Sequence, residues 1–342
     1  MIEVEHIVKE YGATRAVDDI SFSLEKGKIY GFLGPNGAGK STTMNIMTGY
    51  LAPTSGSVRI NGHDILTDAE SAKKDIGYLP EIPPVSPDLT VAEYLRYAAG
   101  LKKIPSKQIR DVVAKSLQMT GLGAYQTRLI KNLSKGYRQR VGLAGAITGL
   151  PQIIILDEPT VGLDPQQIID IRKLITSLRD EHTVILSSHI LSEISSVCDE
   201  LIIISNGKKV AEGTLSMLEA TYCHDNGFVL RALSDSANVA RVLQNISCVR
   251  SIEMIKTDEA DPKSESSQSR SSAFRIMTDD SPYVQEQVAR DLFEAGIAVA
   301  ELYHDTKSLE EVFLNITSVT TFGKNRSGIR DGENIDSLEV HS

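Results

Sequence analysis

The stretch IYGFLGPNGAGKSTTMNIM, Ile29–Met47, decides the fold. An apolar strand leads into a glycine-rich loop and then into a helix, and the centre matches the pattern G-x-x-x-x-G-K-[ST] at every fixed position. Glycines let successive backbone N–H groups turn toward one point, and the helix N-terminus adds the positive end of its dipole. The stretch therefore predicts a phosphate-binding loop between a buried strand and a helix.

The side chains of this loop have expected tasks. Lys40 is expected to reach the β- and γ-phosphates of a nucleoside triphosphate, and Ser41 to bind Mg²⁺. A chance glycine turn would rarely have a strand before it and a helix after it, so we favour the phosphate loop. The nucleotide-binding run is predicted to be Gly34, Pro35, Asn36, Gly37, Ala38, Gly39, Lys40, Ser41 and Thr42.

Two later strands end in groups suited to the same chemistry. IIILDE ends in the carboxylates Asp157 and Glu158, and VILSSHI carries His189 near its end. We expect Asp157 in the Mg²⁺ environment, Glu158 where it can polarise an attacking water, and His189 on the ligand side of the sheet. In isolation, an acid pair after a strand is commonly a solvated turn, and a single histidine is usually structural.

A second helix start has a similar composition. NLSKGYRQR, Asn132–Arg140, gathers a serine, a glycine and several cations ahead of an apolar run. Alone, it would be explained by a capped helix with a solvated basic face.

Composition bounds the remaining possibilities. The 342 residues carry a net charge of −9, and this acidic balance argues against a nucleic-acid partner, which usually meets a basic face. The three cysteines show no C-x-x-C spacing, which favours reduced thiols. The N-terminus lacks an apolar signal region, and the longest apolar stretch, Val141–Leu156, is interrupted and too short to span a bilayer. We expect a soluble intracellular protein.

The order of elements predicts an α/β fold. Strand-like runs alternate with helical stretches over residues 1–218, which favours a mostly parallel sheet covered by helices, with a helical subdomain at about 81–150. Residues 219–317 follow the rhythm of a small βαββαβ module of α+β type, interrupted by the polar loop DEADPKSESSQSRSS. Residues 318–342 are polar and predicted to be disordered.

Five motifs in this order resemble the ATP-binding subunits of ABC transporters, which are P-loop NTPases: GPNGAGKST, LSKGYRQR, IIILDEPT, GLDP and SSHIL. The resemblance covers about residues 1–218. The lysine in LSKGYRQR and the motif SLEEVFLNIT near the C-terminus are similar to ATPase subunits of ABC-2 type exporters, including those linked to drug resistance and gliding motility.

The resemblance implies further roles. Tyr11 would stack on adenine, Glu158 would be the general base, Asp164 would lie at a dimer seam, and His189 would be the switch. Each ATP would lie on the glycine loop of one subunit and be covered by Ser134 and Gly136 of the other, so the resemblance implies an ATP-dependent homodimer. The resemblance thus explains why one chain has two helix starts suited to binding phosphate: they would belong to opposite halves of each ATP site.

Two departures from the family pattern stand out. Glu81 takes the place of a glutamine that ligates Mg²⁺, which a carboxylate can also do while adding a negative charge beside the triphosphate. In the signature, usually LSGGQ, Lys135 and Tyr137 replace a glycine and the glutamine, whereas Ser134 and Gly136 are retained.

The resemblance favours an ATPase with ATP and Mg²⁺ as cofactors that powers export through a separate transmembrane permease. Its location would be cytoplasmic, at the inner face of the membrane. The alternative is a soluble ABC-type ATPase without a membrane partner. A DNA-maintenance ATPase would need a long coiled coil between Lys40 and Ser134, where no sustained heptads occur, and a tandem translation factor would need a second glycine loop. The sequence does not identify the cargo.

Overall fold

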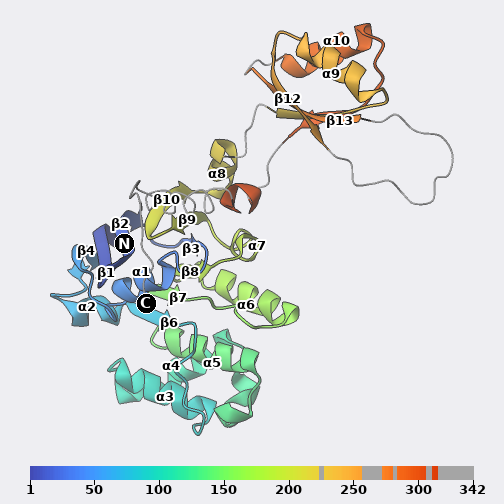
Figure 1. Ribbon diagram of the computed structural model, residues 1–342. Helices are drawn as coiled ribbons and strands as arrows, with labels where there is room; N and C mark the ends of the chain where they lie inside the picture. Colours follow the sequence, from blue (N-terminus) through green and yellow to red (C-terminus); the bar gives the residue numbers. More distant parts are fainter. Residues whose placement is uncertain (223–226, 256–271, 280–282, 306–309, 315–342) are drawn as a thin grey trace, which may run out of the picture. The chain divides into compact units, whose positions relative to one another are not determined.

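The computed structural model describes residues 1–222, 227–255, 272–279, 283–305 and 310–314 (Figure 1). The chain divides into two compact units, one that includes Met1–Leu215 together with Leu314 and one formed by Ser216–Phe313. The predicted polar loop DEADPKSESSQSRSS, up to its last serine, and the predicted tail 318–342 lie outside the described residues.

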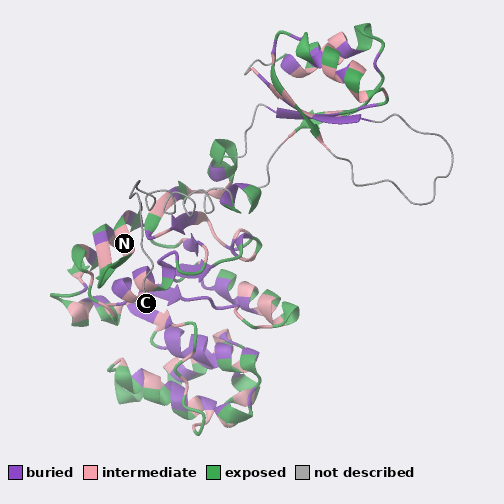
Figure 2. Cartoon of the chain, viewed as in Figure 1, coloured by how far each residue is buried: buried purple, intermediate pink, exposed green. Residues whose placement is uncertain are grey.

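A six-stranded sheet forms the centre of the first unit. Its order is β10-β9-β3-β8-β7-β6, and all neighbours are parallel except β10, which runs antiparallel to β9. Every residue of β3, β7 and β8 is buried, as expected for parallel strands covered on both faces (Figure 2). The strands are β3 (Ile29–Leu33), β6 (Ile76–Leu79), β7 (Ile153–Leu156), β8 (Thr183–Ser188), β9 (Glu200–Ser205) and β10 (Lys208–Gly213).

A second, antiparallel sheet lies in the same unit, with the order β2-β1-β4-β5. One apolar cluster joins it to the central sheet and to α1, the helix Lys40–Met47 that follows the glycine loop. Within this cluster the rings of Phe22 and Phe32 meet edge to face, with centroids 5.2 Å apart. The cluster therefore fixes α1 between the two sheets. The strands are β1 (Ile2–Tyr11), β2 (Thr14–Leu24), β4 (Ser55–Ile60) and β5 (His63–Asp64), and α2 (Ala69–Lys74) follows them.

A group of helices packs around its own apolar cluster, which includes Leu95, Leu117 and Val141. These helices are α3 (Val91–Leu101), α4 (Ser106–Met119), α5 (Lys135–Ile147) and the short turns η1 (Gly123–Tyr125) and η2 (Ile130–Asn132). Thr90 and Glu93 form a reciprocal capping box at the start of α3. The remaining helices of the chain up to residue 222 are α6 (Pro165–Ser177), α7 (Leu191–Ile194) and α8 (Leu215–Tyr222).

The second unit has the order βαββαβ. Its antiparallel sheet, β12-β13-β11-β14, packs α9 and α10 around a core that includes Phe228, Leu243 and Val288. Its elements are β11 (Gly227–Ala232), α9 (Ser236–Gln244), β12 (Val249–Ile255), β13 (Ser272–Thr278), α10 (Val284–Glu294) and β14 (Val299–His304). The predicted fold class is confirmed: a P-loop α/β core with a mostly parallel sheet and helical subdomain, followed by a small α+β domain.

Candidate functional site

The carboxyl ends of three buried strands meet at one edge of the central sheet. Leu33 of β3 pairs with Ser188 of β8, and Leu156 of β7 pairs with Leu186 of β8. The segments that follow these strands therefore converge. They enclose a cavity of about 480 Å³ lined by Ala16, Asn36, Gly37, Ala38, Gly39, Lys40, Ser41, Thr42, Glu81, Glu158, Val161 and His189.

The glycine loop gives this cavity a rim of backbone N–H groups. Gly39 has φ of 105°, a left-handed conformation, and a Cβ at this position would lie 2.6 Å from the carbonyl oxygen of Ala16. Only glycine is accommodated without strain here. Gly39 is also the N-cap of α1, and no side chain caps the first turn. The first N–H groups of α1 are thus available to an anionic ligand.

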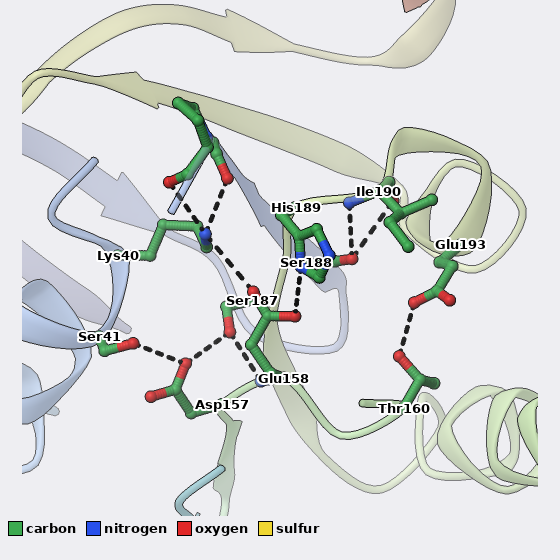
Figure 3. A network of polar contacts seen from close by, with 12 residues as sticks. Lys40, Ser41, Asp157, Glu158, Thr160, Ser187, Ser188, His189, Ile190 and Glu193 are labelled. Atoms are coloured by element: carbon green, nitrogen blue, oxygen red, sulfur yellow. Dashed lines mark hydrogen bonds and ion pairs between the residues drawn. The ribbon is translucent and has the colours of Figure 1, made fainter. Parts of the chain in front are cut away.

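Lys40 points into the protein rather than toward solvent. Its side chain is 5% exposed, and its Nζ donates to the carbonyl oxygens of Gly34 (2.7 Å) and Pro35 (3.3 Å). The same ammonium lies 3.4 Å from Oε1 of Glu158. A buried ammonium needs such partners, and these contacts hold it at the floor of the phosphate loop (Figure 3).

Asp157 lies at the centre of a small hydroxyl network. The Oγ atoms of Ser41 and Ser187 both donate to its Oδ1, over 3.2 and 2.6 Å. Ser187 Oγ also accepts the backbone N–H of Glu158 over 2.8 Å. Ser187 thereby connects both carboxylate positions to β8 (Figure 3). Sequence reasoning missed Ser187, although its position near the end of β8, two residues before His189, was a usable signal.

Glu158 joins the lysine to the histidine. It is 6% exposed, and while its Oε1 faces Lys40, its Oε2 lies 3.0 Å from Nδ1 of His189. Its φ is 47°, in the left-handed region that non-glycine residues rarely adopt. Backbone strain of this kind persists only where the surroundings over-determine it, and it concentrates at functional sites.

Several predicted residues do not line this cavity. Tyr11 is 52% exposed at the end of β1, with Lys9 Nζ 5.4 Å from its ring centroid. Ser134 and Asp164 are the N-caps of α5 and α6, where their side chains accept the backbone N–H groups of Tyr137 (3.4 Å) and Gln167 (2.9 Å). The roles predicted for these residues stay predictions.

Gly136 also lies away from the cavity lining, in the first turn of α5. A Cβ on this glycine would lie 2.2 Å from Oε1 of Gln167. The glycine therefore also permits close packing of α5 against α6 within one chain.

A second cavity, of about 420 Å³, adjoins the loop that begins at Glu81. Its lining is mainly apolar, with the cations Lys135 and Arg138 contributed by α5. Glu81 and Val161 line both cavities. The full lining is Glu81, Ile82, Pro83, Val85, Pro87, Ile130, Lys135, Arg138, Gln139 and Val161.

A buried parallel sheet, a glycine loop with a buried lysine and a strand-end acid pair together define an ATPase of the P-loop class. Residues 17–161 match the ABC transporter family. The bacitracin transport ATP-binding protein BcrA of Bacillus licheniformis is 39% identical over 214 residues, which cover 62% of this chain and 69% of that protein. The daunorubicin/doxorubicin resistance ATP-binding protein DrrA of Streptomyces peucetius is 31% identical over 92% of each chain. This chain belongs to the ABC transporter family, as one of its ATP-binding subunits.

Solved structures agree with this assignment. The structure of an ATP-binding subunit of an ABC transporter has a TM-score of 0.59 and 30% identity, covering 65% of this chain and 93% of its own. A dimeric bacterial ABC transporter cassette has a TM-score of 0.58 and 27% identity, covering 63% of this chain and 99% of its own. Among the residues that the structure describes, no helix combines the length and apolarity needed to cross a bilayer.

Proposed function

We propose that this ATPase powers export through a separate transmembrane permease, and that it works as a homodimer which closes on ATP at the inner face of the membrane. The hydrolytic part of the proposal rests on the contact of one buried carboxylate, Glu158, with both Lys40 and His189 at the glycine-loop cavity. The names of the relatives support export: one is a Nod factor export ATP-binding protein of Ralstonia nicotianae, 35% identical over 62% of this chain and 67% of its own.

ATP binding would rearrange the contacts of Lys40. The γ-phosphate would compete with Glu158 for the ammonium, which now lies 3.4 Å from Oε1. Glu158, no longer paired with Lys40, would then accept a proton from the attacking water. His189, 3.0 Å from Oε2, would keep that carboxylate oriented. ATP would thus activate Glu158 by replacing its contact with Lys40 while its contact with His189 remains.

The residues around Asp157 fit Mg²⁺. The Ser41 hydroxyl and the Asp157 carboxylate are hard oxygen donors 3.2 Å apart, and Glu81 lines the same cavity. Mg²⁺ usually takes few protein ligands and completes its shell with phosphate oxygens and water. When bound, it would neutralise charge on the β- and γ-phosphates.

The positions of the second helix start support a dimer. Ser134 and Gly136 do not line the cavity of their own chain, yet they combine a helix N-terminus with a small residue. A second copy could place them over the ATP held by the first chain. That a related cassette forms a dimer supports this arrangement.

The 420 Å³ cavity supports docking of a cytoplasmic permease segment. Its apolar wall would bury a hydrophobic side chain, and Lys135 and Arg138 favour an acidic residue beside it. Ile82, which lines this cavity, is 82% exposed, so its side chain is available to a docked segment. Because Glu81 lines both cavities, a segment docked in this cavity would meet a residue that also lines the nucleotide cavity.

Glu158→Gln tests the ATPase mechanism and the dimer together. Hydrolysis should fall by about 10²–10⁴-fold, the usual contribution of a positioned general base. Since the phosphate-binding groups are untouched, the variant should accumulate as an ATP-bound dimer in size-exclusion chromatography with ATP and Mg²⁺. Near-normal hydrolysis would remove Glu158 as the base, and a monomer at high protein concentration would contradict the dimer.

The variant Ile82→Asp tests whether the protein works with a permease, as an exporter subunit, or without one, as a soluble ATPase. Asp88, just before α3, and Glu93, in its first turn, are poorer probes, because Asp88 pairs with Lys131 and Glu93 caps its own helix. Co-expressed with the permease, Ile82→Asp should keep its basal ATPase rate and lose transport by about tenfold or more, because docking would bury a carboxylate without a partner. Leu66→Asp, at an exposed leucine that does not line this cavity, is the control. Normal transport and normal permease co-purification would contradict this docking site.

A further inference from the structure

Thr160 and Glu193 form a short hydrogen bond just outside the nucleotide cavity. The hydroxyl of Thr160 donates to Oε2 of Glu193 over 2.6 Å, and Thr160 is only 7% exposed. Thr160 follows Glu158 by two residues in the loop after β7. Glu193 follows His189 by four residues and belongs to α7. Neither Thr160 nor Glu193 lines the 480 Å³ cavity (Figure 3).

This bond adds to the contacts that join the two segments carrying Glu158 and His189. Ser187 and the pairing of β7 with β8 fix these segments where they leave the sheet, and the Glu158 and His189 side chains meet over 3.0 Å. The Thr160–Glu193 bond fixes the same segments farther along the chain, beyond both Glu158 and His189. Glu158 has a left-handed φ of 47°, which neighbouring structure must impose. Ser187 holds the backbone N–H of Glu158, on the N-terminal side of this strained residue. The bond between Thr160 and Glu193 restrains the backbone on its C-terminal side.

The charged neighbours of Glu158 make its orientation depend on His189. Glu158 faces the Lys40 ammonium and His189, and Asp157 lies at the preceding position. When the γ-phosphate draws Lys40 away, Glu158 would keep His189 as its partner. Its orientation toward the water would then depend on how firmly α7 and the loop after β7 hold His189 against it.

We propose that Thr160 and Glu193 are positioning residues for hydrolysis, which hold His189 against Glu158 during the chemical step without contributing to ATP binding. This rests on the proposed role of Glu158 as the base. A purely structural bond would affect stability alone, whereas a positioning bond affects kcat and its pH profile.

The main test is Thr160→Val, which keeps the shape and removes the donor. In the full-length protein kcat should fall by about tenfold, as small misplacements of catalytic groups do, while KM for ATP stays within about twofold. The kcat–pH profile should also change, which a loss of stability alone would not cause. Thr160→Ser keeps the donor and should restore kcat to within about threefold. Thr176→Val is the control, since it removes another threonine hydroxyl, exposed on α6, that bonds to the Arg172 carbonyl.

Glu193→Ala probes the same bond from a partly exposed position and keeps the proposal testable should Thr160→Val fold poorly. It should reproduce the fall in kcat and the changed profile. Glu193→Gln, whose amide oxygen still accepts the hydroxyl, should lose much less. Wild-type kcat and pH profile in both Thr160→Val and Glu193→Ala would overturn the proposal, as would a Thr160→Ser variant as slow as Thr160→Val.

The double variant Glu158→Gln/Thr160→Val distinguishes this inference from the proposed function. Because the bond acts through Glu158, the double variant should be no slower than Glu158→Gln alone. A further tenfold loss would mean that Thr160 acts elsewhere. If Glu158→Gln itself hydrolyses ATP normally, the base assignment fails, whatever Thr160 does.

Discussion

The helices α1 and α5 begin in opposite ways. α1 follows Gly39, which has no side chain, and no cap satisfies its first turn. α5 follows Ser134, whose own hydroxyl accepts the N–H of Tyr137. The first helix start lines the nucleotide cavity, and the second does not. A helix start without a side-chain cap leaves its first N–H groups available to a ligand bound by the same chain, whereas a capped helix start needs no ligand to satisfy them.

This difference bears on what one chain can do alone. The glycine loop has its lysine, hydroxyl and carboxylates within one chain, at contact distance of one another. The hydroxyl cap explains the LSKGYRQR segment as a helix start within one chain, so the ligand-binding role that we propose for it would depend on a second copy. Variants at the two helix starts should therefore fail in different ways.

The largest effect is expected at α1. Lys40→Ala removes the main point charge on the β- and γ-phosphates, and hydrolysis should fall to background, by at least about 10²–10³-fold, with weaker ATP binding. Lys107→Ala, at an exposed lysine on α4, is the control. A well-folded Lys40→Ala protein with wild-type turnover would mean that the glycine loop is not the catalytic nucleotide site.

Gly136→Asp should also be inactive alone, but it should be rescued in trans. In the proposed homodimer it would place a carboxylate near the partner chain's ATP and so would block both sites. Mixed with Lys40→Ala, half of the dimers formed by random pairing are mixed, and each has one intact site. About a quarter of wild-type activity should return in a coupled ATPase assay.

The contact of Gly136 with Gln167 needs its own control, since a side chain at 136 would meet that amide within one chain. Gln167→Ala removes the clash. If Gly136→Asp/Gln167→Ala regains activity without a second variant, the lesion is internal packing and α5 starts as an ordinary capped helix. Continued inactivity with rescue in trans supports the shared site.

The smallest effect is expected at the other end of α5. Lys102 donates to the carbonyl oxygen of Ala146 over 2.9 Å, and burial lowers the pKa of its ammonium from 10.5 to about 8. The folded state thus penalises the charged form. The penalty is complete below pH 8 and is relieved as the pH rises from 8 to 10.5, so this residue makes stability rise over that window.

Lys102→Met should remove this penalty and also the hydrogen bond, which offsets most of the gain. At pH 7 the variant should be more stable by no more than about 1 kcal/mol, and toward pH 10 it should become less stable than the wild type. Urea unfolding at the two pH values measures it. A stability difference that does not change with pH would show that Lys102 is not held at a lowered pKa.

Much of the fold was predictable because its signals are local. The apolar runs of β3, β7, β8 and β9 and the glycine pattern before α1 are contiguous in sequence, and each predicts its own element. Glu158 and His189 were predictable for the same reason, as strand ends. The left-handed backbone of Glu158 and the Thr160–Glu193 bond were not, because they depend on the pairing of β7 with β8. Tyr11 was placed by resemblance alone, and no contact of its ring with the cavity is seen.

Glu81 and Val161 form a wall with a cavity on each side. If ATP fills one cavity and a permease segment fills the other, the two occupants share that wall, and each changes the free energy of the other's binding. Thermodynamic linkage then requires reciprocity: the factor by which ATP alters affinity for the permease equals the factor by which the permease alters affinity for ATP. A transporter that senses its cargo on the membrane side would thereby set the ATP occupancy of this subunit.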